Sequence, residues 1–158
     1  MDMLVNLYTL PEKEPVEGVR VCRVLPPETG RVIDWVEASF GQGWRSECLP
    51  ALSAQPSTCY IAQQNGEIVG FACYDATARG YFGPIGVSEE MRGSGIGREL
   101  LISCLDGMRE AGYGYAVIGW CNHAAPFYEK TVGAVPIAGS EPGNTVYGRM
   151  TQFSVAKE

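Results

Sequence analysis

A run of glycines between a strand-like segment and an amphipathic segment constrains this chain more than any other feature. The run is Arg92-Gly93-Ser94-Gly95-Ile96-Gly97-Arg98, and it follows an apolar stretch that ends at Val87. Glycine tolerates the backbone angles of a tight turn, and the helix predicted after it adds unpaired N–H groups and the positive end of its dipole. Amides that converge in this way bind anions, most commonly phosphates. The alternative is a glycine-rich turn that binds nothing, because such a motif without its context is a weak signal.

The residues after the run exclude the two commonest nucleotide sites. A Walker loop has Lys and then Ser or Thr after its last glycine, whereas Gly97 is followed by Arg98 and Glu99. A dinucleotide site has an acidic residue at the end of the next strand, whereas that strand ends with Ile118-Gly119-Trp120. The sequence therefore indicates a phosphate cradle for another phosphorylated carrier.

The size and charge of the chain limit its classes of function. Its 158 residues, 46% of them hydrophobic, are enough for one domain with its own core. A formal net charge of −6 has the wrong sign for a general nucleic-acid binder, and no basic run interleaved with aromatics occurs. We therefore expect no nucleic-acid partner. Salt screens long-range repulsion of a phosphorylated ligand over about 8 Å, so local geometry, helped by Arg92 and Arg98, can still bind it.

The cysteines and the first residues indicate the cellular compartment of the protein. Six cysteines are scattered along the chain without a paired spacing such as C-x-x-C, which is typical of a reduced cytoplasmic protein. The first residues include Asp2 and no basic cluster, so they do not resemble a secretory signal. No apolar stretch reaches the length of a membrane span. We expect a cytoplasmic protein with no membrane partner.

Apolar periodicity and turn residues predict an α/β (α+β) domain over residues 19–158, after an exposed lead-in at residues 1–18. Strands are expected at 19–25, 58–63, 67–74, 81–87, 115–120, 135–138 and 146–153, and helices at 32–40, 44–54, 95–112 and 126–131. Asn65-Gly66 predicts a hairpin turn. This order gives a mixed, mostly antiparallel central sheet with helices on both faces, in which the helix at 95–112 is one parallel crossover. Pro84 lacks a ladder donor, so its strand must bulge or splay.

The glycine-rich run and its surroundings resemble the GNAT superfamily of acyl-CoA-dependent N-acetyltransferases, in its single-domain bacterial type. The family signature is Arg or Gln, two residues, Gly, one residue, and Gly or Ala, which Arg92 to Gly97 match at each fixed position. The preceding strand, Asn122 and the segment Phe127-Tyr128-Glu129-Lys130 also resemble the family. The resemblance implies a GNAT-like sheet with splayed central strands. It also implies transfer of an acetyl group from acetyl-CoA to a primary amine, in a small molecule or a peptide, by direct attack in a ternary complex.

The resemblance implies where coenzyme A would bind. In the family, backbone amides of the loop hold the pyrophosphate, and the pantetheine arm pairs like an added strand in the gap between the diverging strands. The residues expected to bind the cofactor are Ile85, Val87, Arg92, Gly93, Ser94, Gly95, Ile96, Gly97, Arg98, Asn122, Phe127 and Tyr128. No metal is expected, because Cys121 and His123 are too few to form a site.

The resemblance also implies two catalytic groups. Tyr128 matches the family's tyrosine near the coenzyme A sulfur, and a phenol with a pKa of about 10 is protonated at neutral pH and could protonate the departing thiolate. The alternative role for Tyr128 is to pack its helix against the sheet. The amide of Ile85 could polarise the thioester carbonyl and stabilise the negative charge that develops on its oxygen.

The family's geometry places the acceptor at the turn between the first two helices and at the strand ends. The residues expected to bind the substrate are Phe40, Trp44, Tyr74, Tyr81, Trp120 and His123. So many aromatics favour a partly apolar or flat acceptor over a compact polyamine, although aromatics beside a sheet are usually core. The base that deprotonates the amine stays open among His123, Glu47, Asp75, Glu89, Glu90 and water.

Other interpretations also stay open. A non-catalytic acyl-CoA-binding or sensing module would keep the cradle without working acid and base groups, and a nucleotide-binding regulator would respond to NAD or ATP. The apolar segment at 4–10 and the terminal strand could pair with a second copy to form a homodimer.

Overall fold

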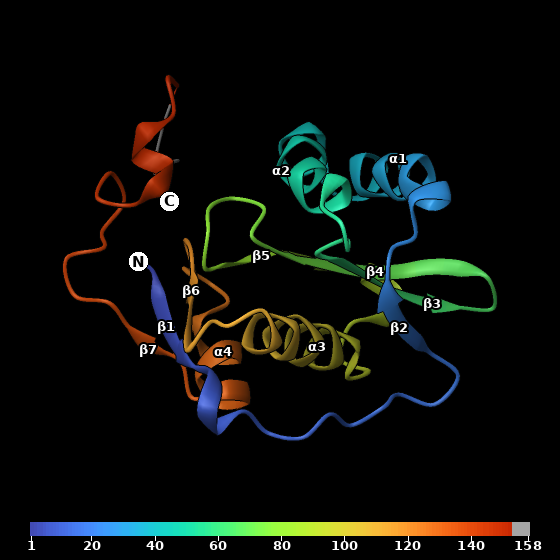
Figure 1. Cartoon of the computed structure of the whole chain (residues 1–158), viewed down its shortest axis with the longest axis horizontal. Helices are drawn as coiled ribbons and strands as arrows, with labels where there is room; N and C mark the ends of the chain where they lie inside the picture. Colours follow the sequence, from blue (N-terminus) through green and yellow to red (C-terminus); the bar gives the residue numbers. More distant parts are fainter. Residues whose placement is uncertain (153–158) are drawn as a thin grey trace.

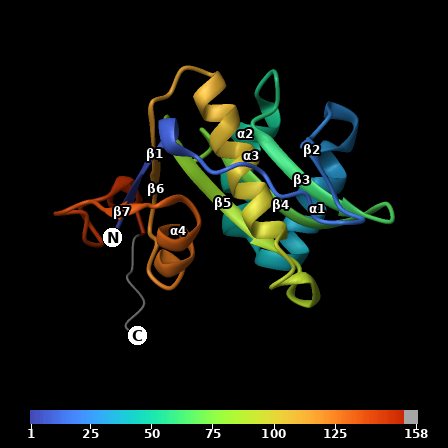
Figure 2. The ribbon, with the colours of Figure 1, turned by 90° about the horizontal axis from the view of Figure 1, so that it is seen from below.

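One seven-stranded mixed sheet, in the order β2-β3-β4-β5-β6-β1-β7, organises the chain. The computed structural model describes residues 1–152 (Figure 1). Its strands are β1 Met3–Asn6, β2 Arg20–Arg23, β3 Cys59–Gln64, β4 Glu67–Tyr74, β5 Tyr81–Val87, β6 Tyr115–Ile118 and β7 Val135–Pro136. Its helices are α1 Thr29–Phe40, α2 Gln42–Ser53, α3 Ile96–Glu110 and α4 Ala125–Val132. Helices α1 and α2 cover one face of the sheet and α3 and α4 the other, which confirms the predicted fold class (Figures 1 and 2).

The antiparallel half of the sheet grows from the predicted hairpin. Asn65 and Gly66 join β3 to β4 with φ angles of 52° and 78°, the positive values that a two-residue hairpin turn needs. Strand β4 is buried on both faces, because Phe71 belongs to the apolar cluster under α1 and α2 whereas Ala72 belongs to the cluster under α3. Helix α3 lies so close to β4 that a Cβ at Gly70 would come within 2.9 Å of the Leu100 side chain.

Helix α3 begins and ends where the glycines predict. Gly95 is its N-cap with φ of 93°, and the chain leaves the helix at Gly112 with φ of 104°. Its apolar face is fully buried against the sheet, as the amphipathic pattern requires. The helix therefore sets the glycine-rich loop firmly at one end of the sheet.

Strands β5 and β6 are parallel but pair only briefly. Tyr81 pairs with Val117 and Phe82 with Ile118, after which β6 ends while β5 continues to Val87. The predicted splaying is confirmed, and within residues 1–152 no strand pairs with residues 83–87 of β5 on that side.

The first residues belong to the sheet and are not part of an exposed lead-in. Strand β1 pairs antiparallel with β6 along its whole length and with β7 at Met3 and Leu4. Met3, Val5 and Leu7 are buried, with at most 1% of their surface exposed. The apolar alternation is too short to predict a strand by itself, and the partner strands lie far along the chain. At Met3 and Leu4, β1 has partners on both sides within its own chain.

The predicted C-terminal strand pair is wrong in most of its length. Strand β7 has two residues, and Val146–Arg149 form a 3-10 helix in place of a strand. Gly139 and Gly143 have positive φ angles, and β1 fills the position next to β6 that a closing strand would take. Phe153, the end of the predicted strand, lies outside the described residues.

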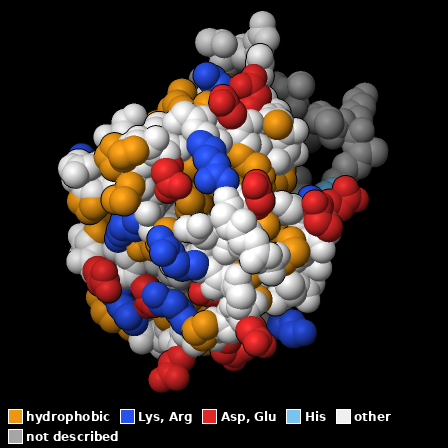
Figure 3. Space-filling model, turned by 90° about the vertical axis from the view of Figure 1, so that its right-hand side faces the viewer, with side chains coloured by type: hydrophobic (Ala, Val, Ile, Leu, Met, Phe, Trp, Pro, Cys, Tyr) orange, Lys and Arg blue, Asp and Glu red, His pale blue; other side chains and the backbone are white. Residues whose placement is uncertain are grey.

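Charges of both signs are mixed over the face shown in Figure 3, where no single basic patch is seen. Within residues 1–152, every helix is too short or too polar to cross a membrane.

Candidate active site

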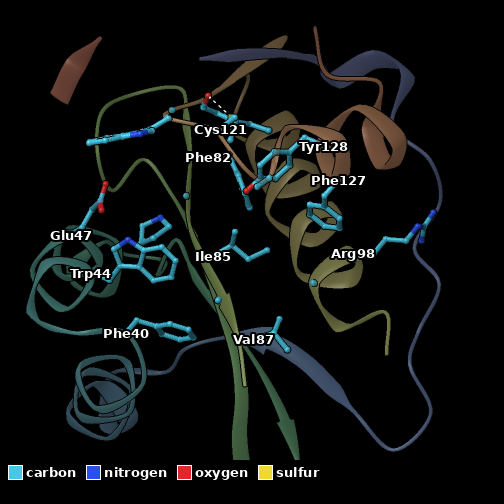
Figure 4. A pocket seen from close by; sticks show the side chains of 18 of the residues that line it. Phe40, Trp44, Glu47, Phe82, Ile85, Val87, Arg98, Cys121, Phe127 and Tyr128 are labelled. Atoms are coloured by element: carbon cyan, nitrogen blue, oxygen red, sulfur yellow. Dashed lines mark hydrogen bonds between the residues drawn. The ribbon is translucent and has the colours of Figure 1, made fainter. Parts of the chain in front are cut away.

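A pocket of about 1020 Å³ opens where β5 and β6 separate. Figure 4 shows β5 running through it, with Ile85 and Val87 between side chains from α1 and α2 on one side and from α3 and α4 on the other. Most of the residues that the sequence predicts for the site line this pocket: Phe40, Trp44, Ile85, Val87, Arg92, Gly93, Gly95, Gly97, Arg98, Trp120, Phe127 and Tyr128. The pocket therefore joins the glycine-rich loop to the aromatic residues of the opposite sheet face.

Three of the residues predicted to bind cofactor do not line the pocket. Ser94 is exposed, and its hydroxyl donates to the Met91 carbonyl. Ile96 is completely buried beneath the loop. Asn122 is exposed, and its Oδ1 lies 3.5 Å from the N-terminal amine of Met1.

Three of the residues predicted to bind the acceptor also lie elsewhere. Tyr74 is in the core, where its hydroxyl accepts a 2.9 Å hydrogen bond from Arg23. Tyr81 is half-buried and does not line the pocket, and burial followed by Asp2 raises its pKa. His123 is exposed outside the pocket. Because side chains alternate along β4, Tyr74 points toward α3 and away from the acceptor side. The strand is apolar on both faces, so its sequence does not show which face Tyr74 belongs to.

The loop before α3 has the geometry of an anion cradle. Gly93 and Gly95 have φ angles of 81° and 93°, and no side chain in the described part of the chain caps α3, so the amides of its first turn keep free donors. Arg98 places Nη1 in a buried position without a hydrogen-bond partner in the described part of the chain. Its Nη2 contacts the Glu12 carbonyl at 3.3 Å and Glu14 at 3.6 Å. A buried guanidinium N–H without a partner and uncapped amides in the first turn of the same helix fit a phosphate group.

Comparison of the sequence with models of protein families identifies its family. A family model described as "Acetyltransferase (GNAT) family" matches residues 29–134. The chain belongs to this family.

Solved GNAT structures share the fold at low sequence identity. A GCN5-related N-acetyltransferase from Sphaerobacter thermophilus is 21% identical with a TM-score of 0.66, over 85% of this chain and 47% of that one. A GNAT family N-acetyltransferase from Escherichia coli, in complex with CoA, is 19% identical with a TM-score of 0.55, over 74% and 71%. A GNAT family acetyltransferase from Brucella melitensis, in complex with acetyl-CoA, is 22% identical with a TM-score of 0.53, over 69% and 80%.

Several of the similar proteins are much longer. The chain spans 19%, 47% and 46% of the length of three matching structures, the S. thermophilus protein among them. A search of curated proteins finds no match.

Tyr128 of this GNAT chain turns its hydroxyl into the pocket (Figure 4). The residue is 5% exposed, and its ring packs edge-on against Phe82 and Phe127 at centroid distances of 6.2 and 5.2 Å. No hydrogen bond to its hydroxyl occurs within residues 1–152. Burial, with a smaller contribution from Cys121, raises the pKa of Tyr128 well above its usual value. The phenol is therefore protonated at neutral pH and free to donate.

Cys121 lines the same pocket but is not an activated thiol. Burial, followed by the charge of Asp2, raises its pKa to about 12. Since the thiolate is the nucleophilic form of cysteine, Cys121 is a poor nucleophile at neutral pH. The described residues contain no group of three or more His, Cys, Asp or Glu side chains placed to hold a metal ion.

The aromatic wall opposite α4 depends on a close approach to β5. A Cβ at Gly86 would come within 2.4 Å of the Phe40 ring, so only glycine lets this ring lie against the strand. Phe40 packs on Trp44 at 5.1 Å between ring centroids, and Trp120 packs on Tyr147 at 5.4 Å. All four rings line the pocket.

Three residues of this wall were not predicted to bind the acceptor. Glu47, which the sequence offers only as a candidate base, lines the pocket, as do Tyr147 and Met150. The Glu47 Oε1 accepts hydrogen bonds from Tyr147, at 2.7 Å, and from the Thr77 hydroxyl. Burial and then Glu47 raise the pKa of Tyr147 well above its usual value. Tyr147 and Met150 fall in a segment that the sequence predicts as a strand, so they were not predicted to line the pocket.

The remaining candidate bases lie outside the pocket. Asp75 accepts hydrogen bonds from Tyr113 and from the Gly80 amide, and Glu89 and Glu90 are exposed in a 3-10 turn.

The N-terminus fixes the position of Trp120. Asp2 is 4% exposed, and its Oδ1 accepts a 3.0 Å hydrogen bond from the Trp120 amide. Trp120 has φ of 53°, a left-handed conformation that a bulky residue adopts only when its surroundings impose it. The Met1 carbonyl also accepts from the Cys121 amide at 3.0 Å. Residues 1 and 2 thus hold the turn that carries Trp120 into the pocket.

Proposed function

We propose that this protein transfers an acetyl group from acetyl-CoA to the nitrogen of a primary amine. One observation carries the proposal: a single pocket brings together the glycine-rich loop, the unpaired part of β5 and the free hydroxyl of Tyr128. Membership of the GNAT family supports it, as do the similar structures determined with CoA and acetyl-CoA.

The donor half of the pocket binds by its backbone. Amides of residues 93–98 and Nη1 of Arg98 bind the pyrophosphate oxygens. Ile85 and Val87 lie in the part of β5 that has no neighbouring strand on one side among the described residues, so their backbone groups can pair with the amides of an extended pantetheine arm.

The chemistry needs three proton movements and one polarised carbonyl. Acetyl-CoA supplies a thioester as the activated acyl group. The amine nitrogen forms a bond to the carbonyl carbon while the carbon–sulfur bond breaks. The Ile85 amide stabilises the charge on the carbonyl oxygen, and Tyr128 gives its proton to the departing sulfur. The amine loses one proton to water, and solvent returns a proton to Tyr128. Direct attack fits the protonated Cys121, which offers no thiolate for a covalent step.

A thiol-release assay tests the proposal. Purified protein with acetyl-CoA is offered amines, amino acids, aminoglycosides and peptides, and mass spectrometry identifies the acetylated product. We expect free thiol to appear only with an acceptor. Binding of CoA without transfer to any acceptor would favour the acyl-CoA-binding module instead. In a thermal-shift panel, stabilisation by NAD or ATP and not by CoA would contradict the donor assignment.

A further inference from the structure

One carboxylate stands in the acceptor half of the pocket. Glu47, on α2, is half-buried, and it is the only Asp or Glu among the described residues that line the pocket. Its hydrogen bonds from Tyr147 and Thr77 both end at Oε1. Within residues 1–152 no donor contacts Oε2, and no salt bridge involves Glu47. A fixed Oε1 and an uncommitted Oε2 leave this carboxylate able to take one further cation or donor.

The surroundings of Glu47 are aromatic. Figure 4 shows Phe40, Trp44 and Glu47 on one side of the pocket, and Trp120 and Tyr147 line it as well. Trp120 is 37% exposed. Aromatic faces attract cations and bury flat hydrocarbon surface. A carboxylate among such rings is suited to an ammonium group attached to an apolar body.

Charge differs between the two ends of the pocket. The arginines that line it, Arg92 and Arg98, belong to the glycine-rich loop, whereas Glu47 belongs to the aromatic wall. An acceptor with its own carboxylate would be repelled by Glu47. A linear polyamine would satisfy Glu47 but would leave the aromatic wall without an apolar partner.

We propose that the acceptor is an arylalkyl primary amine without a carboxylate, whose ammonium group pairs with Oε2 of Glu47 and whose ring lies against Trp44 and Trp120. This inference rests on the proposed transferase function and gives it a substrate class. Glu47 binds the cation, and the amine loses its proton to water before attack.

Binding of matched ligands tests the site without catalysis. Calorimetry compares 2-phenylethylamine with 2-phenylethanol, which has the same ring and no charge, in the presence of CoA. The wild-type protein is expected to bind the amine at least about 10-fold more tightly than the alcohol, because a hydrogen bond to a charged group contributes about 1.5–3 kcal/mol. Glu47→Gln should remove this preference and leave alcohol binding unchanged. Equal binding of both ligands to the wild type would overturn the proposal.

Two further variants test whether the preference for the amine depends on the position of Glu47 or only on net charge. Glu110→Gln removes one negative charge from an exposed position on α3 outside the pocket, and it should keep the wild-type preference for the amine. Glu47→Asp keeps the charge and should restore part of the preference. If Glu110→Gln lost as much preference as Glu47→Gln, net charge and not the site would account for it, and the proposal would be wrong.

Kinetics separates this inference from the proposed function. With acetyl-CoA as donor, 2-phenylethylamine should be a better acceptor than phenylalanine or putrescine. Glu47→Gln should raise the KM for this amine about 10-fold to 100-fold while the KM for acetyl-CoA is unchanged. Transfer at an unchanged amine KM in Glu47→Gln would overturn the amine site and leave the transferase standing. Glu47-dependent binding of the amine without any transfer would overturn the transferase and leave the amine site standing.

Discussion

The two halves of the pocket are built in different ways. The donor half comes from one stretch of the chain, between Gly83 and Arg98, and from α4, and the groups proposed to bind CoA in that stretch are mostly backbone groups. The acceptor half consists of side chains that meet from α1, α2, the end of β6 and the 3-10 helix at Val146–Arg149. A site made of backbone depends on φ angles and glycines, whereas a site made of side chains depends on long-range packing. Substitutions should therefore separate the two halves.

The largest effect is expected from Tyr128, the side chain on which the donor half depends. Tyr128→Phe keeps the ring that packs on Phe82 and Phe127 and removes the hydroxyl directed into the pocket. We expect kcat to fall about 100-fold, the scale of general-acid catalysis, with little change in either KM. Steady-state thiol release measures this. Unchanged kcat would leave Tyr128 only the packing role.

The glycine-rich loop should respond through its backbone. Gly93→Ala adds a Cβ that meets nothing within 4 Å, so its cost comes from the φ of 81°. That strain is about 1–2 kcal/mol for an L-residue, enough to weaken CoA binding about 10-fold if the loop shifts to relieve it. Calorimetry with CoA measures the change.

Gly30→Ala in α1 is the matched control. Its Cβ also meets nothing, but Gly30 lies in a helix without a positive φ, so the change should leave CoA binding unchanged and not lower stability. Equal loss of CoA binding in both variants would contradict the cradle.

The donor half could be predicted from sequence because its signal is local. Arg92 to Gly97 are contiguous, and the strand before and the helix after them have their own periodic patterns. The acceptor half could be predicted only in part. Phe40 and Trp44 flank a recognisable helix turn, but Tyr147 lies in a segment whose β pattern is overridden by the tertiary structure, and Tyr74 alternates to the other face.

The N-terminal strand escaped prediction for the same physical reason. Four residues of alternation carry little information, and the decisive contacts join positions far apart, such as Asp2 and Trp120 at a separation of 118. The left-handed turn at Trp120, expected as the end of a strand, follows from that contact and from no local motif.

A smaller effect is expected where the N-terminus meets the acceptor half. Asp2→Ala removes the acceptor of the Trp120 amide and should raise the amine KM several-fold, since a lost hydrogen bond to a charged group costs about 1.5–3 kcal/mol, part of which goes into stability. The KM for acetyl-CoA should not change. Asp2→Asn keeps a side-chain oxygen at the same place and should recover most of the loss. A parallel rise in both KM values would place Asp2 in the general fold and not in the acceptor half.

The last predicted effect is on stability, and it is absent at neutral pH and present only at alkaline pH. Burial raises the pKa of Tyr128 above its unfolded value, so in the pH range between the two values the unfolded chain has lost a proton that the folded chain keeps. The free energy of unfolding should therefore be unaffected below about pH 9 and should fall as the pH rises through 10 and above. Urea unfolding from pH 8 to 11 measures the slope, which should be shallower in Tyr128→Phe. The same slope in both proteins would show that Tyr128 does not contribute.

Initial rates at varied concentrations of acetyl-CoA and 2-phenylethylamine test the division of the pocket most directly. For the wild type, double-reciprocal lines should intersect, because both substrates are bound before transfer. Gly93→Ala should raise only the KM for acetyl-CoA, and Glu47→Gln only the KM for the amine. Parallel lines, or variants in which both KM values rise together, would contradict a pocket with one half for each substrate.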